Sequence, residues 1–253
     1  MKSEIVLSAH QPNFLPYLGF FDKMLQSDIF VIRDEVLYIK KEYHNRNRIR
    51  INSHDNLKDP QSKWISVPVI DPKDYIMHAK IKKNAKQKNK FWNESLLHEI
   101  EVSYHNAPYF KKFFPELEKI LHNLDESLLF LNIKIIKFFN EVFEIKTKII
   151  LASELGLKPK NYQKSDASED IAKICNVLKA TTYLSGAGGR SYLNLEPFEK
   201  RAIKVEFQDY EHPIYKQHLP GFLPFMAAID ALFCVGKMPE IEENIIQVGA
   251  NIN

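Results

Sequence analysis

Cysteine, glycine and long hydrophobic runs are scarce in this sequence. It has two cysteines and eight glycines among 253 residues, and neither Cys175 nor Cys234 stands in a CxxC pair or near a ligand-spaced histidine. This argues against a disulfide framework and a structural zinc site, and it fits a protein of the reducing cytoplasm. The most apolar helical stretch, 128–143, is interrupted by asparagines and lysines, and the apolar run 5–9 is short. We therefore expect no membrane insertion and no signal peptide.

Several familiar catalytic motifs are also missing. The sequence has no GxSxG elbow, no HExxH pair, no P-loop and no histidine–aspartate cluster with metal-ligand spacing. We therefore expect no metal site and no tightly bound cofactor.

The charge is ordinary in amount but uneven in position. Charged residues make up 26% of the chain and hydrophobic residues 45%, with a formal net charge of +3, which is typical of a globular protein. Between residues 40 and 90, however, 14 lysines and arginines face five acidic residues. Such a segment suits a phosphate, a nucleotide or an acidic carrier protein, or it is simply a solvated face. Its aromatic residues do not alternate with the basic ones, so we do not expect nucleic-acid binding.

The hydrophobic pattern predicts an α/β fold. A strand over 5–9, a helix over 15–26 with Pro16 in its first turn, and a strand over 29–32 form a βαβ unit, which implies a parallel pair. Further elements are expected in chain order as follows: strands over 48–51, 64–69 and 75–81; helices over 91–104, 109–124 and 128–143; a strand over 148–151; a helix over 166–179 capped by Ser165 or Asp166; strands over 182–184 and 203–207; and a helix over 222–235.

These elements suggest one domain over residues 1–253. The N- and C-terminal βα units are predicted to share one mixed, largely parallel sheet, and a helical insertion over about 87–143 is predicted to pack against it as a cap.

Polar side chains gather where the first predicted strand meets the first helix. His10, Gln11 and Asn13 surround the rigid Pro12 at this point. Ligands of α/β sheets usually bind at the carboxyl ends of parallel strands. A histidine there can act as a general acid or base, although it could instead cap the helix. We predict a catalytic role for His10 and substrate contacts for Gln11 and Asn13.

The second predicted strand is followed by an acidic pair within the run 33–40. Asp34 would end on the same sheet edge as His10 if the two strands are neighbours, and a carboxylate behind an imidazole fixes its tautomer. A surface ion pair with Arg33 or Lys40 is the alternative. Tyr38 and Lys40, later in the same run, are further candidates for substrate contact.

Arginines and asparagines alternate in the segment 43–49. In an extended strand Arg46 and Arg48 would share one face, with Asn45 and Asn47 on the other. Two guanidiniums on one face suit a phosphate or a carboxylate, although a solvated edge strand would look similar. We predict substrate contacts for Asn45, Arg46 and Arg48.

Two later segments carry weaker signals. Ser185 and Arg190 flank the glycine-dense turn 186–189, whose amides could hold an anion, although a plain tight turn would have the same sequence. Tyr215 and Gln217 precede the last predicted helix and are included as candidate substrate contacts. Asp230 lies at the edge of that helix's apolar stripe and needs a buried partner, such as Arg190 or a backbone N–H.

The same segments resemble the WbqC-like family. The resemblance is carried by His10-Gln-Pro-Asn-Phe-Leu-Pro-Tyr-Leu-Gly-Phe-Phe-Asp22, by the run 28–36 and by Asn45-Arg-Asn-Arg-Ile49. It continues through 164–166, 183–186, 192–193, 215–217 and 229–232, and so spans nearly the whole chain. The lysine-rich turn after Asn56 and the glycines of 186–189 depart from the family pattern.

The resemblance implies a role in bacterial surface-polysaccharide biosynthesis, including O-antigen clusters. It suggests transfer of an acyl or aminoacyl group to the amine of a nucleotide-linked amino sugar. The donor would be a thioester of coenzyme A or of an acyl or peptidyl carrier protein, with phosphopantetheine as part of a co-substrate. His10 would be the base, Asp34 its orienting partner, Asn13 or Gln11 the oxyanion donor, and Arg46 and Arg48 the diphosphate ligands. Two alternatives remain: nucleotidyl or adenylyl transfer, and a non-enzymatic binding protein.

Overall fold

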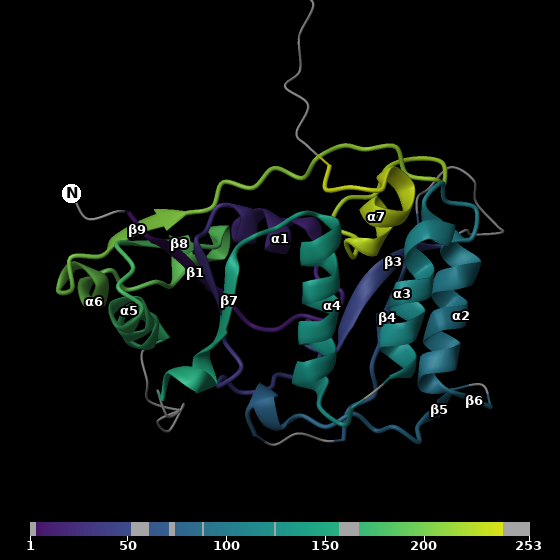
Figure 1. The fold of residues 1–253 in the computed structure, drawn as a ribbon, viewed down its shortest axis with the longest axis horizontal. Coiled ribbons are helices and arrows are strands. Elements are labelled where there is room, and N and C mark those ends of the chain that lie inside the picture. Colours follow the sequence, from purple (N-terminus) through teal and green to yellow (C-terminus); the bar gives the residue numbers. More distant parts are fainter. Residues whose placement is uncertain are drawn as a thin grey trace, which may run out of the picture.

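Five parallel strands form the central sheet of the protein. A computed structural model describes residues 4–51, 61–70, 74–87, 89–123, 125–156 and 167–239 (Figure 1). The strand order is β7 (Lys148–Leu151), β2 (Ile29–Ile32), β1 (Val6–His10), β8 (Thr182–Ser185) and β9 (Lys204–Phe207). Every pairing in this sheet is parallel. The predicted α/β class and the parallel pair of the first βαβ unit are confirmed, and β1 lies in the centre.

Helices cover both faces of this sheet, and the apolar side chains of each strand alternate between the two faces. Leu7 and Ala9 of β1 belong to a cluster with α5 (Ala167–Val177) and α6 (Glu196–Glu199), whereas Phe30 of β2 joins α1 (Leu18–Leu25) on the opposite face. Successive side chains of a strand point to opposite faces, so each strand contributes to both layers. His10 lies on the α1 side, where its ring contacts Phe20 edge-on at 5.1 Å.

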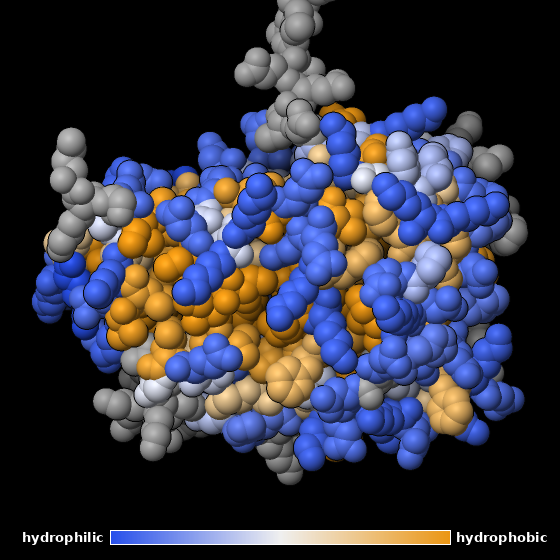
Figure 2. Space-filling model, viewed as in Figure 1, coloured by the Kyte–Doolittle hydropathy of each residue, from blue (hydrophilic) through white to orange (hydrophobic). Residues whose placement is uncertain are grey.

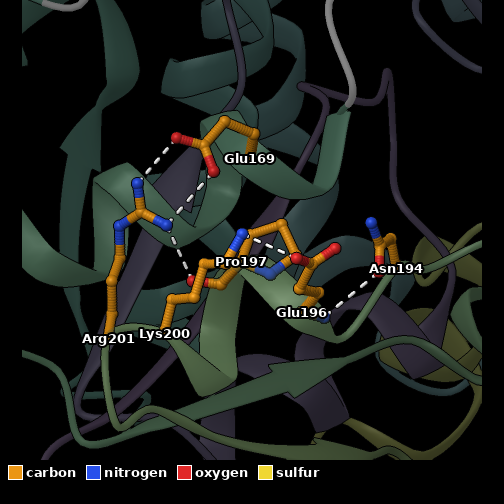
Figure 3. Close-up of polar contacts among 6 residues, drawn as sticks. All are labelled: Glu169, Asn194, Glu196, Pro197, Lys200 and Arg201. Atoms are coloured by element: carbon orange, nitrogen blue, oxygen red, sulfur yellow. Dashed lines mark hydrogen bonds and ion pairs between the residues drawn. The ribbon is translucent and has the colours of Figure 1, made fainter.

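A polar network connects α5 and α6 (Figure 3). Arg201, just after α6, donates to both carboxylate oxygens of Glu169 at 3.1 and 2.6 Å and to the Pro197 carbonyl at 2.7 Å. Glu196 bonds Lys200 at 2.6 Å, and its backbone N–H donates to the side chain of Asn194 at 3.1 Å. These groups are partly solvated, so the ion pairs contribute at most about 1 kcal/mol each and mainly fix the orientation of α6.

The remaining elements lie beside the sheet. β3 (Arg46–Ile51) and β4 (Gln61–Ser66) form an antiparallel hairpin, and α2 (Trp92–Tyr104), α3 (Phe110–His122), α4 (Leu128–Val142) and α7 (Ile229–Val235) surround it (Figure 1). Their apolar side chains share one cluster with those of α1 and β2. Short elements complete the described chain: η1 (Ile76–His78), β5 (Lys86–Gln87), β6 (Lys90–Phe91), η2 (Ala152–Leu155) and η3 (Ala187–Ser191).

Ring contacts show how the helices join the sheet layer. Phe21 of α1 contacts Phe139 of α4 at 5.0 Å and Phe143, just after α4, at 5.5 Å. α2, α3 and α4 fall within the stretch where the sequence predicts a helical insertion. The division into one domain with an insertion stays a prediction.

Several predicted elements differ in the structure. The strand expected over 64–69 is β4, which covers 61–66. The strand expected over 75–81 is the 3₁₀ helix η1, with isolated bridges at Tyr75 and Ile81. α1 begins at Leu18, so Pro16 precedes the helix. The helix expected over 222–235 is α7 alone, because Phe225 adopts a left-handed conformation with φ of 60° that an α-helix cannot include. The predicted caps of α5, Ser165 and Asp166, lie outside the described residues.

The edge strand β7 is only partly covered. Figure 2 shows hydrophobic residues gathered between α4 and α5, over β7, and framed by hydrophilic ones; Ile149, Ile150 and Leu151 of β7 are half-buried. Among the described helices, none combines the length and the apolar character that a membrane span requires.

Candidate functional site

A cleft of about 740 Å³ opens at the carboxyl ends of β1 and β8. This is the edge of a parallel sheet where ligands usually bind, as the sequence predicts. Aspartate, glutamate and cysteine are all missing from the described residues that line the cleft; these are Ala9, His10, Gln11, Tyr17, Gly19, Phe20, Lys23, Arg33, Val36, Leu37, Ile39, Ala167, Ile171, Tyr183, Ser185, Gly186, Ala187, Gly188, Gly189, Tyr192, Gln208, Tyr210 and Phe225.

His10 ends β1 and faces this cleft. Its Nδ1 lies 2.9 Å from the backbone carbonyl of Gln11. Because a carbonyl only accepts, Nδ1 carries the proton and Nε2 holds the lone pair in the neutral ring. Nε2 has no hydrogen-bond partner among the described residues. Burial, assisted by the positive charge of Lys23, lowers the pKa of His10 to about 3. The ring is therefore neutral at physiological pH and presents an acceptor to the cleft.

Lys23 of α1 is a buried amine in the same cleft, and it was not among the predicted site residues. Its side chain is 3% exposed, and Nζ donates to the Ala9 carbonyl at 3.0 Å. Burial lowers its pKa to about 7. A signal for it exists in the sequence, since Lys23 lies three residues after Phe20 and four before Ser27, on the helix face that packs inward.

Arg33 places a guanidinium in the cleft directly after β2. It is buried and forms an ion pair with Glu35, and its backbone N–H donates to the His10 carbonyl at 2.8 Å. Burial raises the pKa of Glu35, and the adjacent Arg33 partly opposes this shift. The alternative pairing of Arg33 with Asp34 is therefore wrong, because Arg33 pairs with Glu35.

Asp34 has a different partner from the one predicted. Its two carboxylate oxygens accept hydrogen bonds from the backbone N–H and the hydroxyl of Ser153, at 3.0 and 2.6 Å. Ser153 belongs to η2, which follows β7 on the opposite side of β2 from β1. Within the described part of the chain no hydrogen bond joins Asp34 to His10, and the Gln11 carbonyl orients the imidazole instead. The catalytic role assigned to Asp34 stays a prediction, and the hydrogen bond to His10 on which it was based is not found among the described residues.

The arginine-rich segment forms the predicted strand but does not line the cleft. Arg46 and Arg48 share one face, as expected, and both guanidiniums lie over the Trp64 ring, at 4.2 and 5.8 Å from its centroid. Asn45 donates to the Val67 carbonyl at 2.7 Å and holds the hairpin together. The predicted substrate contacts of Asn13, Tyr38 and Lys40 also lie outside the set of cleft-lining residues. Within the described lining, Arg33 therefore supplies a guanidinium to the cleft and Lys23 an amine.

The glycine-dense turn forms one wall of the cleft as the 3₁₀ helix η3. Ser185 and the glycines line the cleft, whereas the guanidinium of Arg190 lies over the Phe207 ring at 4.8 Å. A Cβ added at Gly189 would lie 2.1 Å from Ser185 Oγ, so the Ser185 hydroxyl would have to move to admit a side chain there.

A Gly189→Ala variant is expected to lose about 1–3 kcal/mol of folding stability, because the added methyl group must displace the buried Ser185. Gly188→Ala is the matched control, since nothing lies within 4 Å of its added Cβ. Urea unfolding followed by circular dichroism measures both. Equal stability of the two variants would contradict this account, and Ser185→Ala should restore part of the loss in Gly189→Ala.

Aromatic side chains form another wall. Tyr17 contacts Tyr210 edge-on at 5.9 Å and Phe225 at 6.4 Å. Phe225 is 50% exposed although its backbone is held in a strained conformation, a combination that often marks functional sites. Gln208 is positioned by hydrogen bonds to the Gly19 carbonyl and to Asp22, at 3.0 and 2.6 Å. Neither Gln208 nor Tyr210 was predicted, since the loop that carries them has no motif.

Tyr215 and Gln217 bind Asp230 and do not line the cleft. Asp230 Oδ2 accepts from the Tyr215 hydroxyl at 2.7 Å and from Gln217 Nε2 at 2.8 Å, and Oδ1 accepts from the Tyr104 hydroxyl at 2.9 Å. Burial raises the pKa of Asp230 despite these bonds. Arg190 is therefore not the partner of Asp230.

Metal-ligating atoms of three residues also meet beside this network. Donor atoms of His218, Asp230 and Cys234 lie within 4.8 Å of one another. His218 Nε2 lies 2.6 Å from the Ser103 carbonyl, and Cys234 Sγ lies 3.4 Å from His218 Nδ1. These groups already bond one another or the backbone, which favours a structural role.

The fold is that of an α/β protein with a parallel central sheet, and a cleft with basic side chains in its described lining opens at the strand ends. A profile of the WbqC-like protein family matches residues 11–240, and the chain belongs to this family. It is similar to the "uncharacterized protein Rv1507c" of Mycobacterium tuberculosis (strain ATCC 25618 / H37Rv), with 29% identity over 229 residues, which are 89% of this chain and 92% of the relative. No solved structure matches the chain.

Proposed function

We propose that the protein transfers an acyl or aminoacyl group from a thioester to the amine of a nucleotide-linked amino sugar. One observation carries this proposal: His10, Lys23 and Arg33 bring basic groups to a cleft whose described lining contains no carboxylate. Both substrates of such a reaction carry phosphates, as a sugar diphosphate and as the phosphopantetheine of coenzyme A or a carrier protein. A cleft lined by the guanidinium of Arg33 and by further basic groups suits them.

The cleft also suits the reaction itself. The described lining offers no cysteine, so direct transfer to the amine is favoured over a thiol-bound intermediate. The tetrahedral oxyanion needs a hydrogen-bond donor, and the side-chain amide of Gln11, which lines the cleft, can supply one. The aromatic wall formed by Tyr17, Tyr210 and Phe225 gives a flat surface for a nucleobase or a sugar ring.

In this proposal His10 is a hydrogen-bond acceptor. Its neutral Nε2 accepts an N–H from the incoming amine and directs the nitrogen lone pair toward the thioester carbonyl. With a pKa of about 3, the imidazole is too weak a base to remove a proton from an ammonium group at neutral pH.

The test is a transfer assay with a panel of acyl- and aminoacyl-thioesters and nucleotide-linked amino sugars. Free thiol and the mass gain of the sugar nucleotide are measured together. We expect transfer for at least one pair and a loss of about 100-fold in kcat/KM for His10→Ala, since one orienting contact to the reacting amine is removed. His98→Ala, remote from the cleft lining, is the control.

Two results would overturn the proposal. One is a protein that binds sugar nucleotides but forms no acylated product with any thioester of the panel. The other is a folded His10→Ala variant that transfers at the rate of the unaltered protein, which would remove His10 from the reaction.

A further inference from the structure

We propose that Lys23 is the proton acceptor for the incoming amine, an inference that rests on the function proposed above. Its side chain is buried in α1 yet lines the cleft. Its hydrogen-bond partner in the described structure is a neutral backbone carbonyl, that of Ala9, at 3.0 Å. A buried ammonium group normally requires a carboxylate, so this environment favours the neutral amine.

The groups that surround Lys23 are consistent with a neutral amine. His10 on β1 is neutral near pH 7, so it offers no negative charge that would stabilise an ammonium group on Lys23. Phe30 of β2 places its ring 5.8 Å from Nζ, a cation–π distance that by itself favours the ammonium form and that burial outweighs. The guanidinium of Arg33, which also lines the cleft, forms an ion pair with Glu35.

The nearest acids in the sequence bind elsewhere. Asp22 accepts from Gln208 and Gln26, at 2.6 and 2.7 Å, and Asp28 accepts from the backbone N–H of Val6 at 2.8 Å. Neither makes an ion pair with Lys23 in the described part of the protein. Burial is accordingly the cause that brings the pKa of Lys23 to about 7, where a base is most useful at neutral pH.

The amine also has space in front of it. Lys23 Nζ lies 3.8 Å from the position that a Cβ on Gly186 would occupy, and Gly186 itself lines the cleft. The absence of a side chain at residue 186 leaves room beside Nζ. A substrate nitrogen placed there would lie beside Nζ, in the cleft that His10 also lines.

The proposed step balances as follows. The sugar ammonium gives one proton to the neutral Nζ of Lys23, and the freed amine attacks the thioester carbon. The new C–N bond forms and the C–S bond breaks. The second proton leaves the substrate nitrogen for the departing sulfur, which gives the thiol, and the Lys23 ammonium returns its proton to water.

The first experiment measures the amine without using activity. Lysines of the full chain are dimethylated with ¹³C-formaldehyde and titrated by NMR, and the Lys23 signal is assigned by its loss in Lys23→Met. We expect this signal to titrate near pH 7, well below those of the exposed lysines. Titration together with the exposed lysines would overturn the inference even if the protein transfers acyl groups.

The second experiment uses the transfer reaction. Lys23→Met should lower kcat about 100-fold at pH 7 with little change in the KM for the sugar nucleotide. Added trimethylamine should restore part of the rate of Lys23→Ala, since a tertiary amine accepts a proton but forms no stable amide. Lys111→Met, on the exposed side of α3, is the control.

The outcomes separate the two proposals. Transfer that survives Lys23→Met overturns the role of Lys23 and leaves the proposed function standing. Full activity of Lys23→Arg, or a change confined to KM, would make Lys23 a fixed cation for phosphate and would also overturn it. If no thioester serves as donor, the proposed function falls and the base role with it.

Discussion

An Asp230→Ala variant is expected to lose about 3–5 kcal/mol of folding stability. The carboxylate is fully buried and accepts hydrogen bonds from Tyr104 at the end of α2 and from Tyr215 and Gln217 in one later segment. Removing it takes this acceptor away from the buried Tyr104 and Gln217 and the half-buried Tyr215, although Gln217 keeps its bond to the Leu223 carbonyl. Each lost bond costs about 1–3 kcal/mol before relaxation and water entry reduce the sum. Urea unfolding with linear extrapolation measures the loss.

Two further variants test this explanation. Tyr215→Phe removes one donor and leaves the carboxylate, so a loss of about 1 kcal/mol is expected. Asp230→Asn keeps one acceptor oxygen, so its loss of folding stability should lie between those of Tyr215→Phe and Asp230→Ala. A loss below 1 kcal/mol for Asp230→Ala would show that the network is not what holds α7 against the 215–217 segment.

The elements that the sequence predicts well are those whose signal is local. β2 and β7 have the predicted bounds, because a short apolar run between polar residues is typical of a buried strand. α2 and α4 differ by one residue at one end, since their apolar residues recur with helical period. The predictions of a strand over 75–81 and of a helix over 222–228 were wrong because both segments depend on backbone geometry. Residues 75–81 form bridges to other segments, and Phe225 has a left-handed conformation.

The sequence predicts where the candidate site lies, but it does not predict most of the residues that line it. His10 and Gln11 line the cleft because they lie at the carboxyl end of β1. Their position could be predicted because the βαβ pattern places this end of the strand at the sheet edge where ligands generally bind. The partner of Asp34 could not be predicted. Ser153 is 119 residues away, and nothing in the sequence states that β7, rather than another strand, lies beside β2.

The surroundings of Lys23 and Arg46 could not be predicted for the same reason, because they depend on distant parts of the chain. A lysine on an inward helix face indicates burial, but its neutral environment depends on β1 and on the turn after β8, far away in the chain. The alternation of Arg46 and Arg48 was predicted, yet the ring beneath them, Trp64, belongs to a strand whose pairing was not.

A Lys23→Met variant is expected to be more stable than the unaltered protein at pH 7, by about 2–4 kcal/mol. The pKa of Lys23 is about 7 in the folded state against an ordinary value of 10.5. Between these pH values the unfolded chain binds the proton more strongly, so the stability of the unaltered protein rises as pH increases from 7 to 10.5. Each pKa unit corresponds to about 1.4 kcal/mol, from which the lost hydrogen bond to the Ala9 carbonyl, about 1 kcal/mol, is subtracted.

Urea unfolding between pH 7 and pH 10 tests this expectation. Methionine removes the titrating group, so the stability advantage of the variant should shrink as pH rises and nearly vanish at pH 10. The pKa of His10 is also lowered, to about 3, but its contribution changes only between pH 3 and about 6.5, below this window. Lys111→Met, an exposed lysine, should leave the pH dependence unchanged. A less stable Lys23→Met variant, or an unchanged slope, would mean that the buried amine is charged and well compensated. A variant that gains stability while losing transfer would instead show that the fold retains a destabilising buried lysine because the reaction requires it.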